Sequence, residues 1–436
     1  MNSHPPRSFP PIFCGMLFAA SLALAQSPDP WSDAQIDQRI QKYRTAEVTL
    51  TITDAAGKPV QGEVAIEQTR HKFLFGCNAY MLGRCGEPAA ETAYRKQFAA
   101  VFNFATLPFY WGAYEHQEDH PDADRLRRMA TWCAENNILP KGHPLCWHNV
   151  APKWLNDREV DAIERAQLAR IEREVTTFRG LIDTWDVVNE VIDTPGNENG
   201  RNPIARWCQK LGRAGLINAA FTRARKHNPD TTLLLNDYRV DDAYAKIIRE
   251  CLDADMPIDV IGLQSHMHTG VWSPEKLWQV CERFAPFGKP LHFTELTILS
   301  GPLKSHPNWN QSHPDWRTTP EGEARQAEQV RRFYRLAFSH PAVEAITWWD
   351  FSDRGAWMTA PAGLLRQDMT PKPAYHVLEK LIKQDWWTAP QKLTPDPTGQ
   401  IHFRAYLGAY RLTAGNHTTN FQLNTPGKQT LDIKLP

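Results

Sequence analysis

Eight short, mostly apolar runs alternate with longer helical segments through the middle of the chain. Their brevity and the helical periodicity between them indicate strands. The expected strands are 73–79, 101–106, 140–147, 184–190, 232–238, 260–265, 291–296 and 345–351. Strands and helices that alternate in this way within residues 71–383 predict an α/β protein with a (β/α)8 TIM barrel. The alternative, an open doubly wound sheet, is disfavoured because no glycine-rich phosphate loop follows any run.

Two of these runs carry a glutamate as their last or penultimate residue. Residues 185–190 read WDVVNE, and residues 291–296 read LHFTEL, so the carboxylates are Glu190 and Glu295. An unpaired ionised side chain inside a buried strand costs several kcal/mol. We therefore place both carboxylates at the carboxyl edge of the parallel sheet, where the active sites of (β/α) barrels lie. Two carboxyl groups at such an edge are the minimum that hydrolysis of a glycosidic bond requires.

The two ends of the chain differ from its middle. Residues 1–25 predict a signal peptide, with Arg7 as the positive start, an apolar run and a small-x-small cleavage pattern at 23–25. We expect an exported protein, secreted or periplasmic, with no membrane contact after cleavage. Residues 26–70 predict a helix and a β-hairpin, and 384–436 predict a C-terminal β-rich module. Both ends show the alternation of antiparallel strands, and we expect them to pack together.

The overall charge excludes two classes of partner. The chain has 49 basic and 49 acidic residues and a net charge of zero. Nucleic acids and anionic membrane surfaces both select a basic face, so neither is expected to bind here.

Tryptophan is abundant, with 16 residues in the chain. A tryptophan offers a flat apolar face with one donor, which suits stacking on sugar rings, although most tryptophans belong to the core. Trp309 and Trp316 lie in a long loop, 297–320, which follows the seventh expected strand. Loops of this length are more often functional than idle, and two interpretations stay open: loop packing or an outer sugar platform.

Neither cysteine nor histidine spacing predicts a metal site. The chain has eight cysteines, of which Cys14 falls in the signal peptide, and none forms a CxxC pair. We read the others as small buried side chains, with one disulfide possible. His266 and His268 form a His-x-His pair, but it follows the sixth expected strand rather than the first, where metal-dependent barrel hydrolases usually carry it. We expect no metal and no cofactor.

Several further motifs carry a family resemblance. Together with WDVVNE and Thr294–Glu295, the chain contains KGHPLCWH at 141–148, LNDY at 235–238, GLQSH at 262–266, ITWW at 346–349 and PKPAY at 371–375. In these residues the chain resembles glycoside hydrolase family 10, whose characteristic activity is endo-1,4-β-xylanase. The resemblance covers about residues 70–383 and rests on the motifs jointly.

The resemblance implies a role for each matching residue. Glu190 would be the acid/base and Glu295 the nucleophile of a retaining double displacement. Asn189 is similar to the residue that bonds the sugar 2-hydroxyl, and His266 to the histidine that donates to the nucleophile. Gln264 lies on the same face of its strand as His266 and would contact the acid/base. The residues that match the lining of the subsite before the scissile bond are His143, Trp147, Trp349 and Trp357. For His143, Trp349 and Trp357, plain core packing is the competing interpretation.

One stretch departs from the family pattern. Members usually carry Thr-x-Glu-Asn-x-Met-Lys-Trp after the second strand, and its Glu, Asn and Lys contact the outer sugars. This chain reads TLPFYW at 106–111, two residues shorter, with Tyr110 where the Lys would be. We expect weaker recognition of plain xylose at that position and room for a decorated or different β-glycoside.

The sequence thus predicts a secreted retaining endo-1,4-β-xylanase that acts as a monomer on a polysaccharide substrate. One alternative keeps the chemistry and changes the substrate to another plant β-glycan or β-glycoside. The other is a non-catalytic carbohydrate-binding protein with a decayed barrel. Loss of catalysis in such a barrel usually involves loss of a catalytic carboxylate. Both Glu190 and Glu295 are present, which disfavours this alternative.

Overall fold

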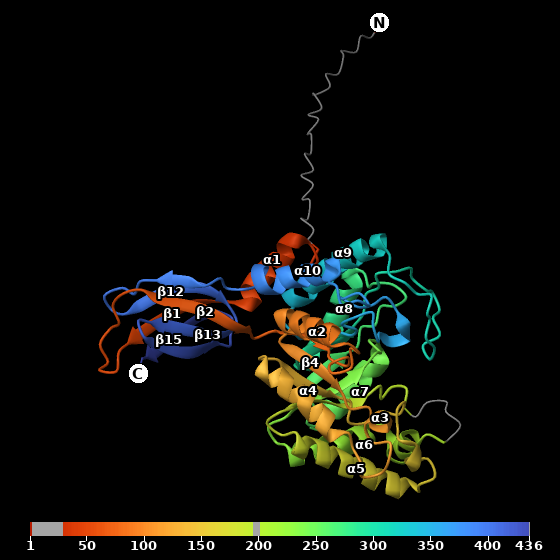
Figure 1. The fold of residues 1–436 in the computed structure, drawn as a ribbon. Helices are drawn as coiled ribbons and strands as arrows, with labels where there is room; N and C mark the ends of the chain where they lie inside the picture. Colours follow the sequence, from red (N-terminus) through yellow and green to blue (C-terminus); the bar gives the residue numbers. More distant parts are fainter. Residues whose placement is uncertain (2–28, 195–200, 436) are drawn as a thin grey trace.

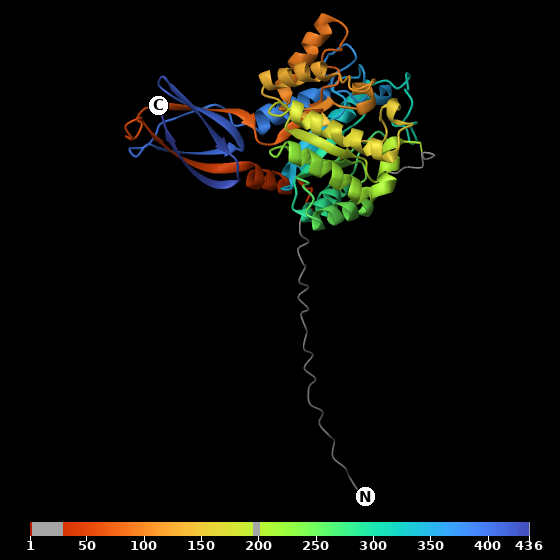
Figure 2. The same ribbon diagram turned by 90° about the horizontal axis from the view of Figure 1, so that it is seen from below.

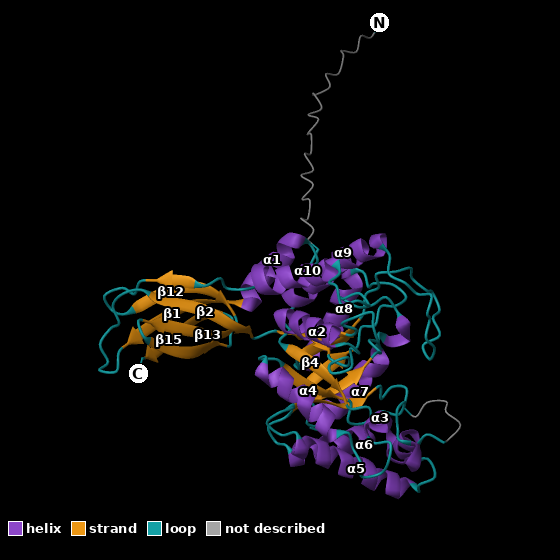
Figure 3. Cartoon of the chain, in the orientation of Figure 1, coloured by secondary structure: helices purple, strands orange, loops and turns teal. Residues whose placement is uncertain are grey.

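The computed structural model describes Met1 and residues 29–194 and 201–435. Apart from Met1, the expected signal peptide at 1–25, with Cys14, lies outside the described residues. A helix-covered barrel and a smaller module built of strands lie side by side (Figures 1 and 3). Within the described residues, no helix has the length and apolar character that crossing a bilayer requires.

The larger part is a closed parallel barrel with the strand order β10–β3–β4–β5–β6–β7–β8–β9. Its strands are β3 (Leu74–Asn78), β4 (Phe104–Pro108), β5 (Leu139–His143), β6 (Thr184–Asn189), β7 (Thr232–Asp237), β8 (Val260–Leu263), β9 (Leu291–Leu296) and β10 (Val343–Trp348). The predicted (β/α)8 barrel is confirmed, and each expected strand overlaps an observed one. The second was placed too early, because the apolar Val101 closes the buried face of the preceding helix rather than opening β4.

Helices wrap the outside of the barrel between successive strands. They are α2 (Pro88–Val101), α3 (Trp111–Tyr114), α4 (Ala123–Glu135), α5 (Val160–Thr177), α6 (Pro203–His227), α7 (Asp242–Asp253), α8 (Pro274–Phe284), α9 (Pro320–Ser339) and α10 (Pro373–Lys380), with short turns η1 (Lys153–Leu155), η2 (Ala285–Phe287), η3 (Trp357–Thr359) and η4 (Leu381–Asp385). Local chemistry sets several starts: the Asp241 carboxylate caps α7, and proline opens α6, α8 and α9. Strands and helices share one continuous apolar core.

The two chain ends form the smaller module together. After α1 (Asp33–Arg44), strand β1 (Thr45–Thr53) lies between β12 (Gln400–Tyr406) and β15 (Gly427–Lys434). A second sheet has the order β11–β2–β13–β14, from β11 (Gln391–Leu393), β2 (Val64–His71), β13 (Gly408–Ala414) and β14 (His417–Leu423). Residues of both sheets, among them Leu50, Ile66 and Leu412, share a single core. The ends therefore pack face to face as a β-sandwich.

The expected N-terminal hairpin is wrong in its pairing. The chain does turn tightly after β1, where the Asp54 amide donates to the Lys58 carbonyl at 2.9 Å. However, β2 then enters the other sheet, and β1 pairs with β12 and, in parallel, with β15. The physical reason is that each strand has one apolar face. Two such faces bury more surface across a sandwich than side by side in one sheet.

Arg44 joins the module to the barrel. Its buried guanidinium donates to the carbonyls of Phe338 (2.6 Å), His340 (2.6 Å) and Val343 (2.7 Å), the last at the start of β10. Burial lowers the pKa of Arg44 to about 10, so it is still charged at neutral pH. Helix α1 packs against α9 at the same junction. The view from below again shows the sandwich at one side of the barrel (Figure 2). The module is thus attached at the amino ends of the barrel strands, opposite the edge where Glu190 and Glu295 emerge.

Replacing Arg44 tests whether this junction stabilises the protein. Arg44→Met removes three buried hydrogen bonds to backbone carbonyls, so we expect a loss of about 3 kcal/mol in the free energy of unfolding. Urea unfolding of the whole chain measures it. Arg404→Met is the matched control, because Arg404 is exposed and pairs with Glu47 at the surface. It should cost under about 1 kcal/mol. Equal losses would contradict a special role for Arg44.

Candidate active site

The candidate residues all lie at the carboxyl ends of the barrel strands. Asn189 closes β6 with Glu190 directly after it, Glu295 is the penultimate residue of β9, and His143 closes β5. The loops that follow β5, β8 and β10 contribute the others, which are Trp147, Gln264, His266, Trp349 and Trp357. Strand polarity therefore brings to one edge residues that are far apart in the sequence.

Glu190 sits on a constrained backbone and is held from two sides. Its φ of 56° is in the left-handed region, which is uncommon for a residue with a side chain and is typical of functional positions. Its Oε1 accepts from Gln264 Nε2 at 3.0 Å, and its Oε2 accepts from Trp147 Nε1 at 2.9 Å. Burial raises the pKa of Glu190 and the charge of Glu295 adds to this, which together outweigh the two donors. The carboxyl group is therefore biased toward its protonated form.

Glu295 is biased in the opposite direction. Its Oε1 accepts from Asn236 Nδ2 at 2.8 Å, and its Oε2 lies 3.0 Å from His266 Nε2. Burial alone would raise the pKa of Glu295, but the His266 hydrogen bond and the electrostatic interactions with His143 and Lys141 lower it overall. His266 Nδ1 also lies 3.1 Å from Thr297 Oγ1, which orients the ring. Glu295 is thus kept ionised although it is buried.

Three amide side chains connect the two carboxylates. Gln264 Nε2 lies 3.2 Å from Asn189 Oδ1 as well as donating to Glu190. Asn236 Nδ2 donates to Asn189 Oδ1 at 2.8 Å and to Glu295 Oε1, also at 2.8 Å. Glu190 and Glu295 therefore belong to one continuous hydrogen-bond network rather than to separate cavities.

Asn236 is a residue to which the sequence analysis assigned no role. It belongs to the LNDY motif, and its place near the end of a predicted strand could have marked it. Thr294 Oγ1 donates to Asn236 Oδ1 at 2.6 Å, which fixes the direction of the amide. Gly262 on the next strand leaves the space for it, since a Cβ there would lie 2.4 Å from Asn236 Oδ1.

The buried pair of Asp186 and Lys141 orients the His143 ring. Asp186 Oδ2 lies 2.6 Å from Lys141 Nζ and 2.7 Å from His143 Nδ1, and all three side chains are buried. Burial raises the pKa of Asp186, but the charge of Lys141 and the His143 contact outweigh it and keep the carboxylate ionised. The imidazole is therefore held with Nδ1 toward Asp186 and Nε2 directed away from it.

Aromatic rings surround His143. Trp349 lies 5.5 Å from His143 and 5.7 Å from His266 between ring centroids, so it connects the two histidines. Tyr110 lies 5.4 Å from His143 and 5.5 Å from Trp147. The tyrosine that stands at the family's lysine position is therefore part of this site.

Tyr80 is a second aromatic residue that sequence reasoning missed. It follows β3, its ring lies 5.4 Å from Trp349, and its hydroxyl donates to the Tyr110 hydroxyl at 3.2 Å. No motif marked it, because its contacts come from the neighbouring strand of the barrel. Burial raises the pKa of both tyrosines well above its usual value, so the pair is neutral.

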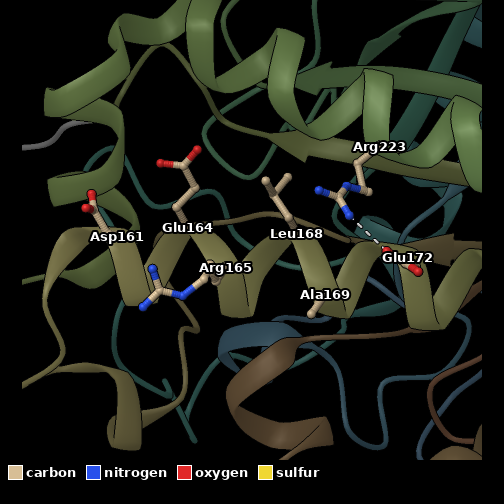
Figure 4. A pocket seen from close by; sticks show the side chains of 7 residues that line it. All are labelled: Asp161, Glu164, Arg165, Leu168, Ala169, Glu172 and Arg223. Carbon is tan, nitrogen blue, oxygen red and sulfur yellow. Dashed lines mark hydrogen bonds and ion pairs between the residues drawn. The ribbon is translucent and has the colours of Figure 1, made fainter.

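Other groups of polar residues lie apart from this site. A surface pocket between α5 and α6 is lined by paired charges such as Arg223 and Glu172, 2.9 Å apart, and by no catalytic candidate (Figure 4). Within the described ranges, no three His, Cys, Asp or Glu side chains are grouped to hold a metal ion. The seven cysteines described there are all free and buried.

Comparisons with known proteins agree with this geometry. The model of the family described as "Glycosyl hydrolase family 10" matches residues 69–381. Endo-1,4-beta-xylanase B of Thermotoga neapolitana is 27% identical over 284 residues, which are 61% of this chain and 77% of that protein. The xylanase 10B structure from Thermotoga petrophila RKU-1, in complex with xylobiose, superposes with a TM-score of 0.60 at 25% identity and covers 72% of this chain and 95% of that one.

A third relative is similar beyond the barrel. Anti-sigma-I factor RsgI6 of Acetivibrio thermocellus is 25% identical over 410 residues, which cover 90% of this chain and 48% of that protein. An alignment of this length extends from the barrel into the β-sandwich. The chain therefore spans about half the length of this relative.

Proposed function

The chain belongs to glycosyl hydrolase family 10, and we propose that it is a secreted, monomeric, retaining endo-1,4-β-xylanase that cleaves xylan with two glutamates. One observation carries the proposal: two buried carboxyl groups share one hydrogen-bond network while their pKa values are shifted in opposite directions. A general acid must hold its proton and a nucleophile must be ionised, so the two carboxyl groups need pKa values shifted in opposite directions. Export rests on the signal pattern at residues 1–25.

The first step would form a covalent intermediate. Ionised Glu295 attacks the anomeric carbon, and the bond to the leaving oxygen breaks as Glu190 gives that oxygen its proton. Asn236 and His266 hold the two oxygens of Glu295, which positions the nucleophile. Asn189 lies between the two carboxylates, where its amide can bond the 2-hydroxyl of the reacting sugar.

The second step would return the enzyme to its starting state. Glu190, now ionised, takes a proton from a water molecule, whose oxygen attacks the anomeric carbon and displaces Glu295. The product keeps the configuration of the substrate because two inversions have occurred. Gln264 and Trp147 donate to Glu190 and stabilise its ionised form between the steps.

Chemical rescue separates the two roles. Glu190→Ala should still form the glycosyl-enzyme from an aryl glycoside with a very good leaving group, because such a group needs no acid. Added azide should then restore turnover by replacing the activated water. Glu295→Ala should lose turnover on the same substrate, and azide should not restore glycosyl-enzyme formation. Equal loss in both variants, with rescue of neither, would contradict the assignment.

The pH profile should reflect both shifted groups. Activity needs protonated Glu190 and ionised Glu295, so kcat/KM should fall as pH rises through the raised pKa of Glu190 and as pH falls through the lowered pKa of Glu295. Gln264→Leu removes a donor to ionised Glu190 and should move the alkaline limb to higher pH. His266→Ala removes the strongest stabiliser of ionised Glu295 and should move the acid limb upward. If Gln264→Leu moved the acid limb instead, the roles would be reversed.

A second candidate function keeps the reaction and changes the substrate to another β-glycan or a decorated xylan. Tyr110 and Tyr80 favour it. Tyr110 puts a neutral hydroxyl where the family carries a charged lysine, and the Tyr80 hydroxyl donates to it. A charged donor and a hydroxyl of this kind select different sugar substituents.

Hydrolysis rates on a panel of substrates distinguish the two candidates. We expect kcat/KM on unsubstituted xylo-oligomers to be lower than on decorated xylan fragments of equal length, because the family's polar contacts to outer xylose are absent. Each rate is measured as newly formed reducing ends. Equal kcat/KM on unsubstituted and decorated fragments would contradict this second candidate and support plain xylan as the substrate.

A further inference from the structure

The two tryptophans of the long loop after β9 have different environments. Trp316 is only 4% exposed, packs with Leu299 and Met358, and donates from Nε1 to the Pro302 carbonyl at 2.6 Å. It belongs to the packing of the loop. Trp309 is 42% exposed and stacks on Trp357, with ring centroids 5.6 Å apart and an interplanar angle of 28°. The two interpretations that the sequence left open therefore apply to different residues.

The stacked pair is continuous with the active site. The ring of Trp357 lies 5.0 Å from that of His266, which contacts the carboxylate of Glu295. Trp357 itself is 36% exposed, so both rings of the pair reach the surface. The stack thus extends outward from the nucleophile.

A buried histidine supports the pair from behind. The ring of His268 lies 5.5 Å from Trp309 and 5.2 Å from Trp357, nearly perpendicular to each. Its two nitrogens have no hydrogen-bond partner among the described residues, and burial lowers its pKa well below the usual value. His268 is therefore an uncharged aromatic support, and its polar atoms remain unsatisfied in an otherwise apolar stack.

Backbone contacts between two loops fix the orientation of the pair. The His313 amide lies 2.9 Å from both the Met358 carbonyl and Thr359 Oγ1, which ties the Trp309 loop to η3. The Asp350 carboxylate accepts from the Trp357 amide at 3.2 Å. Met358 and Thr359 have φ values of 58° and 55° in the left-handed region, a conformation that side chains disfavour. The strained residues directly follow Trp357 in η3.

We propose that Trp309 extends Trp357 into a two-ring platform that binds a pyranose ring next to the one that reacts. The inference rests on the proposed function and adds a sugar contact from this chain's own long loop. A pyranose has an apolar face of C–H groups, which stacks on an exposed indole, while its hydroxyls stay in water. The bound ring comes from one of two sources, the neighbouring sugar of the main chain or a sugar branch on the reacting unit.

Steady-state kinetics of Trp309→Ala test the platform. We expect kcat/KM to fall about tenfold on xylohexaose or on glucuronoxylan fragments. The loss should come from a higher KM with kcat unchanged, because stacking contributes to binding rather than to bond cleavage. The loss should be smaller on an aryl β-xyloside, which supplies only the reacting sugar. Loss on xylohexaose assigns the main chain as the source, and loss confined to the branched fragments assigns the branch. Trp309→Phe, which keeps a ring, should recover part of the affinity.

Leu303→Ala is the matched control, because Leu303 is 52% exposed on the same loop and lies outside the platform. It should behave as the wild type on every substrate. Unchanged KM in Trp309→Ala on all substrates, or an equal loss on the aryl xyloside, would overturn the platform. A wild-type protein that cleaves no xylan would overturn the proposed function instead. The same comparison on the β-glycan that it does cleave would then decide the platform.

Discussion

Two carboxyl groups are buried at one edge of the barrel, and the rest of the site is arranged around the energetic cost of that burial. Placing Glu190 and Glu295 together out of water disfavours charge on both. The two carboxyl groups have different hydrogen-bond partners, so their pKa values differ. Glu295 receives Asn236 and His266, while Glu190 receives the neutral donors Gln264 and Trp147. One carboxyl group is thereby kept ionised and the other is biased toward its proton, and the proposed chemistry depends on this difference.

The barrel provides these partners because its strands all point the same way. Asn236 is the penultimate residue of β7 and Gln264 follows β8, so the two strands between β6 and β9 supply the amides that connect the glutamates. The space for Asn236 depends on Gly262, where any side chain would collide with its amide. The β-sandwich is attached at the opposite end through Arg44, so its presence does not restrict the site.

How far the sequence predicts a structural feature depends on the range of the interaction behind it. The eight strands were predicted because each depends on its own apolar run, and the end of a run marks a strand end. The N-terminal hairpin was predicted wrongly, because β1 finds its partners β12 and β15 more than 300 residues away. Tyr80 was missed for a related reason. Its contacts with Trp349 and Tyr110 come from neighbours across the barrel that no local pattern encodes.

The sequence by itself determined the barrel, the two glutamates at strand ends and the motif residues beside them, because periodicity and strand polarity are local properties of a chain. Only the tertiary structure decided which partners shift each carboxyl pKa and which of two neighbouring loop tryptophans is exposed. Trp309 and Trp316 are chemically identical and seven positions apart. Their difference comes from Trp357, His268 and the apolar cluster around Met358, which pack against one or the other only after the loops have met.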